Sequence, residues 1–166
     1  MGELHLIIGC MWAGKSTEML RQVRRYIQHR SIIIKYDDGL GSKTHDKIEY
    51  EAIFSRLLTN VDILPFKVIG IDESQFFTDL LPFCKEALRL DKIIIVSGLD
   101  GDFLQRPFGD ILNLIPICDS VVKLHAVCAI CYKEASFSKR TCDGQSLIIP
   151  GDNYIPVCRI CKDICK

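Results

Sequence analysis

Residues whose types and spacing can carry chemistry occur first near the start of the chain. The pattern G-x-x-x-x-G-K-[ST] is matched by Gly9, Cys10, Met11, Trp12, Ala13, Gly14, Lys15 and Ser16, and Thr17 follows. Glycines let such a loop fold around a phosphate, with backbone amides at a helix N-terminus pointing at its oxygens. The lysine would place a charge at the outer phosphates, and the Ser16 hydroxyl would be a ligand for Mg²⁺. We therefore expect this loop to bind the phosphates of a nucleotide.

An acidic pair, Asp72-Glu73, follows an apolar stretch at residues 67–71. A carboxylate at the C-terminal end of a buried parallel strand lies at the ligand-binding edge of its sheet. In proteins with a phosphate loop an aspartate there holds magnesium, and a neighbouring acid can take a proton from an attacking group. A solvated strand end would also carry such a pair, and the phosphate loop is what favours the catalytic interpretation.

Cysteines form the second group that can carry chemistry. The sequence has nine, and two Cys-x-x-Cys pairs near its end comprise Cys128, Cys131, Cys158 and Cys161. Two such turns can complete a tetrahedron around zinc, and four protein ligands make the metal structural, since no position stays open. Disulfides are disfavoured because we expect no secretory signal, and an iron–sulfur cluster is less usual with this spacing. Cys142 and Cys165 fit neither pair and are interpreted as spare thiols.

Composition and charge exclude several classes of protein. Twenty-one basic residues balance 21 acidic ones, so the formal net charge is zero. This argues against a protein that holds nucleic acid by a general positive field. No apolar run approaches the ~20 residues of a membrane span, and the first residues match neither a secretory signal nor a myristoylation pattern. We therefore expect a cytoplasmic protein with no membrane and no nucleic-acid partner.

The elements that must position these residues alternate between strands and helices. Apolar runs predict strands at residues 4–8, 31–36, 67–71 and 93–97. Helical periodicity predicts helices at residues 15–28 and 79–90, the first with an apolar face of Met19, Leu20, Val23 and Ile27. Apolar strands between helices indicate a parallel sheet covered on both faces. This alternation stops after about Asn113, so we expect an α/β domain at residues 1–123 and a small cysteine-held lobe at residues 124–166.

Several strings, taken together, resemble the type II thymidine kinase family. They are the GKST of the phosphate loop, IDESQFF at residues 71–77, LDGDF and RPFG at residues 99–109, VCAIC with EASFSKR, and Tyr154 before VCRIC. The similarity spans nearly the whole chain. The sequence has no long tail at either end, and in this it is most similar to the viral members of the family. The resemblance implies a P-loop (RecA-like) α/β fold with helices on both faces of a parallel sheet, and a C-terminal zinc-ribbon-like lobe.

The same resemblance implies an activity and partners. The expected enzyme uses ATP with Mg²⁺ to phosphorylate the 5′-hydroxyl of thymidine or deoxyuridine, in deoxynucleotide salvage for DNA synthesis. It implies a structural Zn²⁺, a homotetramer, and dTTP as a feedback inhibitor. Two other functions stay open: a P-loop ATP-binding module whose zinc ribbon docks nucleic acid, and a kinase for another small molecule.

On the nucleotide side, the resemblance implies roles for four residues. It places the magnesium-linked aspartate at Asp72, the general base at Glu73, and Gln75 near the phosphates. Asp46, in the string Thr44-His45-Asp46, would contribute to the nucleotide–metal site.

On the nucleoside side, the resemblance implies that Phe103 stacks on thymine and that Tyr154 contacts the deoxyribose. The walls of the base pocket would be Met11, Phe76, Leu99 and Phe108. The loop that reads the base edge and closes over the nucleoside would consist of Leu147, Ile148, Ile149, Pro150 and Gly151.

The sequence departs from the family pattern at three places. Ser74 stands where the family usually has glycine, and Cys10-Met11-Trp12-Ala13 stands where it has Pro-Met-Phe-Ser. After Phe103 the chain reads Leu-Gln-Arg-Pro-Phe, one basic residue fewer than the family's Gln-Arg-Lys-Pro-Phe. None of these differences removes a catalytic group named above.

Overall fold

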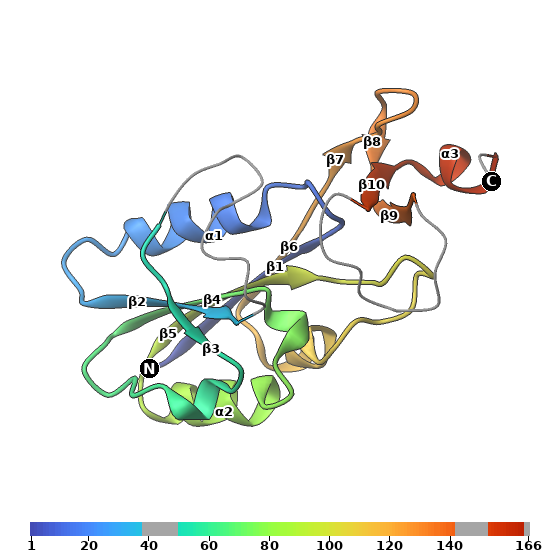
Figure 1. The fold of residues 1–166 in the computed structure, drawn as a ribbon. Helices are drawn as coiled ribbons and strands as arrows, with labels where there is room; N and C mark the ends of the chain where they lie inside the picture. Colours follow the sequence, from blue (N-terminus) through green and yellow to red (C-terminus); the bar gives the residue numbers. More distant parts are fainter. Residues whose placement is uncertain (38–49, 142–152, 165–166) are drawn as a thin grey trace.

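Six parallel strands form the central sheet of the computed structural model, which describes residues 1–37, 50–141 and 153–164 (Figure 1). The strands are β1 (Glu3–Gly9), β2 (Ser31–Tyr36), β3 (Ile53–Ser55), β4 (Val68–Asp72), β5 (Ile93–Leu99) and β6 (Ser120–Leu124). Their order across the sheet is β3-β2-β4-β5-β1-β6, and every pairing is parallel. This sheet confirms the expected α/β class.

Helices cover both faces of the sheet (Figure 1). Helix α1 (Lys15–Arg24) lies on one face, and α2 (Leu80–Arg89) with the 3₁₀ helix Ile111–Ile117 lies on the other. Alternate residues of a strand point to opposite faces, so Ile69 and Ile71 pack with α2 while Val68 packs with α1. A Cβ at Gly70 would come within 2.7 Å of the Met19 sulfur, so glycine lets α1 approach the sheet closely.

Helix α1 is shorter than the sequence predicted. It ends at Arg24, and the next residues form tighter turns in which the N–H of Tyr26 donates to the carbonyl of Val23. Ile27, which was predicted on the apolar face, is 88% exposed. The prediction for Ile27 was therefore wrong, because the tighter turns carry it away from the face that Met19 and Val23 share.

The sequence did not predict the two edge strands, β3 and β6. Both lack a long apolar run, and in β6 the two valines, Val121 and Val122, are 44% and 42% exposed. An edge strand has a neighbour on one side only and needs less apolar surface to be stable. These strands are therefore fixed by pairing with β2 and β1 rather than by local pattern.

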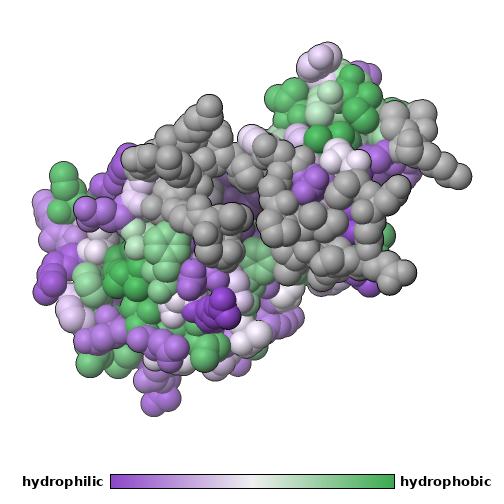
Figure 2. Space-filling model, in the orientation of Figure 1, coloured by the Kyte–Doolittle hydropathy of each residue, from purple (hydrophilic) through white to green (hydrophobic). Residues whose placement is uncertain are grey.

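A small lobe follows β6. It consists of two antiparallel pairs, β7 (Ala126–Val127) with β8 (Glu134–Ala135) and β9 (Phe137–Arg140) with β10 (Tyr154–Val157), and of helix α3 (Arg159–Ile164). Figure 2 shows apolar side chains gathered on this lobe. Val127 of β7 and Ile160 of α3 are both exposed. Within the ranges given above, none of the helices has the length and hydropathy needed to cross a membrane.

Candidate active site

The phosphate loop connects the end of β1 at Gly9 to the start of α1 at Lys15. A Cβ at Gly9 would lie 2.4 Å from the carbonyl oxygen of Leu124, so a larger residue does not fit there. Gly14 has a φ of 77° and Trp12 a φ of 64°, both in the left-handed region. That region is accessible to glycine and strained for tryptophan. The loop therefore has the strand–loop–helix setting that the phosphate-loop pattern requires.

Lys15 is turned back over this loop. Its Nζ donates a hydrogen bond of 2.7 Å to the carbonyl oxygen of Cys10. Burial lowers the pKa of the Lys15 ammonium, and the carboxylate of Glu73 is the strongest influence in the opposite direction. The cation is thus held inside the loop, at the place where phosphate oxygens would need a positive charge.

Asp72, at the end of β4, is 2% exposed and is surrounded by hydroxyl groups. Ser16 and Ser97 donate to its Oδ1 over 2.9 Å and 2.6 Å, and the Tyr50 hydroxyl donates to its Oδ2 over 2.6 Å. These donors satisfy a buried carboxylate that would otherwise be costly to desolvate. Because β5 lies between β4 and β1 in the sheet, Ser97 pairs with Ile7 of β1 and reaches the aspartate at the end of β4.

The oxygens at this point are suited to a magnesium ion. Two neighbouring ligands of an octahedral Mg²⁺, each ~2.1 Å from the metal, lie about 3 Å apart. The Ser16 Oγ and the Asp72 Oδ1 are separated by 2.9 Å. Both are oxygen ligands, which Mg²⁺ prefers. Ser16 and Asp72 therefore fit the pair of magnesium ligands that the sequence predicted.

Glu73 follows Asp72 in an unusual backbone conformation. Its φ of 54° lies in the left-handed region, which costs a residue other than glycine of order 1–3 kcal/mol and is typical of functional sites. Burial raises the pKa of the Glu73 carboxyl and the Asp72 carboxylate adds to this, while Lys15 opposes it. A glutamate tuned in this way is suited to accept a proton at neutral pH.

Gln75 holds the Glu73 carboxylate in place. It is 4% exposed, and its Nε2 donates to the Glu73 Oε2 over 2.7 Å. Its Oε1 accepts a hydrogen bond of 3.0 Å from the backbone N–H of Leu99. The amide therefore bridges the acidic pair and the end of β5, and its predicted contact with phosphates stays a prediction.

These groups line one pocket at the carboxyl edge of the sheet. The lining residues are Met11, Trp12, Gly14, Lys15, Ser16, Thr17, Asp72, Glu73, Gly98 and Leu99. Two predicted walls of the base pocket, Met11 and Leu99, are thus brought beside the phosphate loop and the acidic pair.

The aromatic residues predicted for the nucleoside form two clusters. Phe76 lies against Phe108, with ring centroids 5.5 Å apart and planes nearly perpendicular, and also against Tyr36. Phe103 lies 6.4 Å from Tyr154, and the Arg140 guanidinium is 3.8 Å from the Phe103 ring centroid. Arg140 also donates to the Tyr154 hydroxyl over 3.2 Å. The Phe103 ring thus makes a cation–π contact with Arg140.

The turn that carries Phe103 is fixed by Asp102, which the sequence did not single out. Its buried carboxylate accepts from the backbone N–H groups of Leu104 and Arg106 over 2.8 Å and 2.9 Å. Its Oδ2 also accepts from the Arg106 guanidinium, whose Nε and Nη2 are each 2.9 Å away. Arg106 is therefore used to hold this turn, in the stretch where the family has one more basic residue.

Hydrogen bonds attach the phosphate loop to the lobe. The N–H of Met11 donates to the Ser138 Oγ over 3.0 Å, and the Cys10 thiol donates to the carbonyl of Ala135 over 3.4 Å. The Trp12 indole N–H donates to the carbonyl of Tyr154 over 3.3 Å. The departures from the family pattern at Cys10 and Trp12 thus both contact the lobe.

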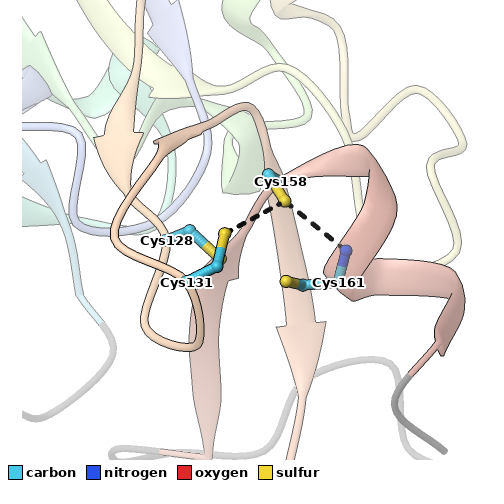
Figure 3. A group of neighbouring side chains, drawn as sticks. All are labelled: Cys128, Cys131, Cys158 and Cys161. Carbon is cyan, nitrogen blue, oxygen red and sulfur yellow. Dashed lines mark hydrogen bonds between the residues drawn. The ribbon is translucent and has the colours of Figure 1, made fainter.

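The four paired cysteines come together in the lobe (Figure 3). All four sulfurs lie within 4.8 Å of one another, and those of Cys131 and Cys158 are 3.6 Å apart. Sulfurs at ~2.3 Å from a tetrahedral zinc lie about 3.8 Å apart. Cys128 and Cys131 come from the turn between β7 and β8, and Cys158 and Cys161 from the start of α3.

The pKa values of these thiols are also those expected of a site that binds a cation. Burial acts to raise the pKa of Cys128, but the backbone N–H groups of Cys131 and Cys158 outweigh it and lower that pKa to about 6. The pKa of Cys161 is raised, by its contact with Cys131 first and by burial second. The pKa of Cys158 is also lowered, chiefly by the backbone N–H of Cys161. Two thiolates thus form easily and Cys161 resists ionisation, so a cation is needed to hold all four as thiolates.

Three sets of predicted residues lie outside the part of the chain that the structure describes. They are Thr44, His45 and Asp46, the loop from Leu147 to Gly151, and the two cysteines Cys142 and Cys165. Of the residues that sequence reasoning missed, Ser97 had a signal, since it is a polar residue in an otherwise apolar strand. Tyr50, Asp102 and Ser138 had none, because only the folded chain brings them to the site.

The sequence is similar to known thymidine kinases. A profile of the family described as thymidine kinase matches residues 2–162. The thymidine kinases of Vaccinia virus (strain Western Reserve), Monkeypox virus and Variola virus are each 49% identical to it over 170 residues, covering 96% of this chain and 96% of theirs. The matched range contains the phosphate loop, the acidic pair and both cysteine pairs.

Proposed function

The chain belongs to the thymidine kinase family, and from this premise we propose that it transfers the γ-phosphoryl group of ATP to the 5′-hydroxyl of thymidine or deoxyuridine. The product is the nucleoside monophosphate, made for deoxynucleotide salvage. The observation that carries the proposal is the single pocket in which Lys15, Ser16, the acidic pair, Met11 and Leu99 meet.

The phosphate loop supplies charge and orientation for the transfer. Phosphoryl transfer needs little covalent help from a protein, and the gain comes from positioning and from neutralising charge. Lys15 donates a hydrogen bond to the Cys10 carbonyl in this structure and would move to the outer phosphates. Residues 9–17 would bind the phosphates with their backbone amides. Mg²⁺, held by Ser16 and Asp72, would neutralise further charge on the transferring group.

Glu73 is the general base in this proposal. Its carboxylate would accept the proton of the 5′-hydroxyl as that oxygen attacks, which requires the acid to be ionised and oriented. Gln75 supplies the orientation through its bond to the Glu73 Oε2.

The nucleoside would lie between the aromatic residues and the lobe. We propose that thymine stacks on Phe103, that Tyr154 contacts the deoxyribose, and that Phe76 and Phe108 wall the base pocket. Arg140 lies on one face of the Phe103 ring, so thymine would stack on the opposite face or take the place of the guanidinium. The loop of residues 147–151 would read the base edge, and Asp46 would join the nucleotide site.

Further parts of the proposal concern the whole molecule. We propose a structural zinc at the four cysteines, whose sulfur spacing supports it. Residues 1–123 would form the ATP-binding domain, and residues 124–166 the lobe that holds the nucleoside lid. We also propose a cytoplasmic homotetramer inhibited by dTTP.

A coupled assay of ADP release tests the activity. We expect release that requires both thymidine and Mg²⁺, that deoxyuridine supports as well, and that added DNA does not increase. DNA-stimulated release without a nucleoside would instead indicate the ATP-binding module with a nucleic-acid-docking ribbon. Release with another small molecule but not with thymidine would indicate a different kinase.

A further inference from the structure

Tyr50 is a residue near the phosphate loop to which neither the motifs nor the proposed transfer gives a role. It precedes β3 in the chain and is half-buried. Its ring packs on the apolar cluster that Met19, Val23 and Val68 form beneath α1. Its hydroxyl donates to the Asp72 Oδ2 over 2.6 Å. A side chain from outside the motifs thus reaches the expected magnesium aspartate.

The three hydroxyl groups around Asp72 divide its two oxygens between them. Ser16 and Ser97 both donate to Oδ1, whereas Tyr50 donates to Oδ2. Donors fixed to both oxygens prevent the carboxylate from rotating about its bond to Cβ. The fixed orientation keeps Oδ1 facing Ser16, which is the other expected magnesium ligand. Each carboxylate oxygen has roughly two lone-pair sites, and the two serines take both of those on Oδ1. A cation at Oδ1 would therefore take the site that the Ser16 hydroxyl leaves when its own oxygen turns to the metal.

We propose that Tyr50 is a positioning residue for the magnesium ion of the phosphate loop. Its hydroxyl holds Asp72 in the orientation that presents Oδ1, beside Ser16, to the metal. The inference rests on the proposed function, because the ion arrives with ATP. Hydrogen-bond partners of ligating carboxylates are part of a metal site, and their loss typically weakens metal affinity by about 10–100-fold.

A competing interpretation predicts the opposite sign. If the Tyr50 hydroxyl occupied a position that the metal needs, it would have to leave when the ion binds. Removing that hydroxyl would then strengthen metal binding. The two interpretations are therefore separated by the direction of one measured change.

The test is Tyr50→Phe in the full chain, with the affinity for a non-hydrolysable ATP analogue measured by calorimetry in Mg²⁺ and in EDTA. In EDTA we expect the variant and the wild type to bind the analogue with equal affinity. The factor by which Mg²⁺ increases that affinity should be about ten-fold smaller in the variant. The Mg²⁺ concentration for half-maximal activity should rise by the same factor. The KM for thymidine and the kcat at saturating Mg²⁺ should stay unchanged. Tyr26→Phe is the matched control, since it removes a hydroxyl beside the same cluster and leaves the three donors to Asp72 in place.

An unchanged or larger gain from Mg²⁺ in Tyr50→Phe would overturn the inference. So would a wild-type chain whose affinity for the analogue does not depend on Mg²⁺. A loss in both EDTA and Mg²⁺ would show a general structural role instead and would also overturn it. A wild-type chain that binds the analogue with Mg²⁺ but leaves thymidine unphosphorylated would contradict the proposed function alone.

Discussion

The phosphate half of the proposed active site and its proposed nucleoside half are built by different means. In the phosphate half, the polar side chains lie at the ends of β4, β5 and β1, which are neighbours in one sheet. The Asp72 carboxylate by itself accepts hydrogen bonds from Ser16, Ser97 and Tyr50. In the nucleoside half, Phe103 is carried by a turn and Tyr154 by the small lobe, and they meet through ring contacts and Arg140. The first half is held by hydrogen bonds between neighbouring strand ends, whereas the second is held by packing between separate segments.

The largest expected effect comes from removing the support of the nucleoside half. Cys128→Ser leaves an incomplete tetrahedron, and because a structural zinc site folds together with its metal, the lobe should unfold. We expect zinc in the protein, measured by elemental analysis, to fall from one per chain to none, and activity to be lost. Cys118→Ser, outside the lobe, is the control and should keep both. Active protein without zinc would contradict the prediction.

Within the phosphate half, the next largest effect is expected from the base. Glu73→Gln keeps the shape and the bond to Gln75 but cannot accept a proton, so kcat should fall by roughly 10²–10⁴ while the KM values change little. Steady-state kinetics with both substrates measures this. Glu86→Gln, exposed on α2, should leave kcat unchanged. Wild-type turnover in Glu73→Gln would remove the assigned role.

A change confined to the nucleoside half should affect one substrate only. Phe103→Ala removes the stacking face, which is worth ~1–3 kcal/mol per base in nucleic-acid binders, so the KM for thymidine should rise about ten-fold or more. The KM for ATP should not change, because the phosphate loop is intact. Leu104→Ala, at the exposed neighbouring position, serves as control. A rise in the KM for ATP alone would refute the division into two halves.

The smallest expected effect belongs to a single hydroxyl of the same half. Tyr154→Phe keeps the ring beside Phe103 and removes the group that accepts from Arg140. One hydrogen bond of ordinary strength corresponds to a rise of roughly three-fold in the KM for thymidine. Tyr132→Phe, at a lobe position that is 82% exposed, should cause no change. Equal effects from the two variants would deny Tyr154 a contact with the nucleoside.

The same two halves differ in how far the sequence predicted them. The phosphate loop, the acidic pair and four strands follow from local patterns, and the sheet order then places them together. The cysteine pairs were equally local. Ser97 and Tyr50 reach Asp72 only through the order of strands and the path into β3, which no spacing along the chain encodes. Phe103 and Tyr154 were located by resemblance, whereas Asp102 and Ser138, which support the nucleoside half, depend on contacts between distant segments.

Hydrogen bonds between the phosphate loop and the lobe connect the two proposed substrate sites, so that the binding of one substrate would affect the binding of the other. Met11, Cys10 and Trp12 each connect the loop to the lobe, so a ligand that restrains the loop would also restrain part of the proposed nucleoside site. The second ligand would then lose less conformational entropy on binding, and this is positive cooperativity. Such coupling is reciprocal, so the factor by which the ATP analogue tightens thymidine must equal the factor by which thymidine tightens the analogue.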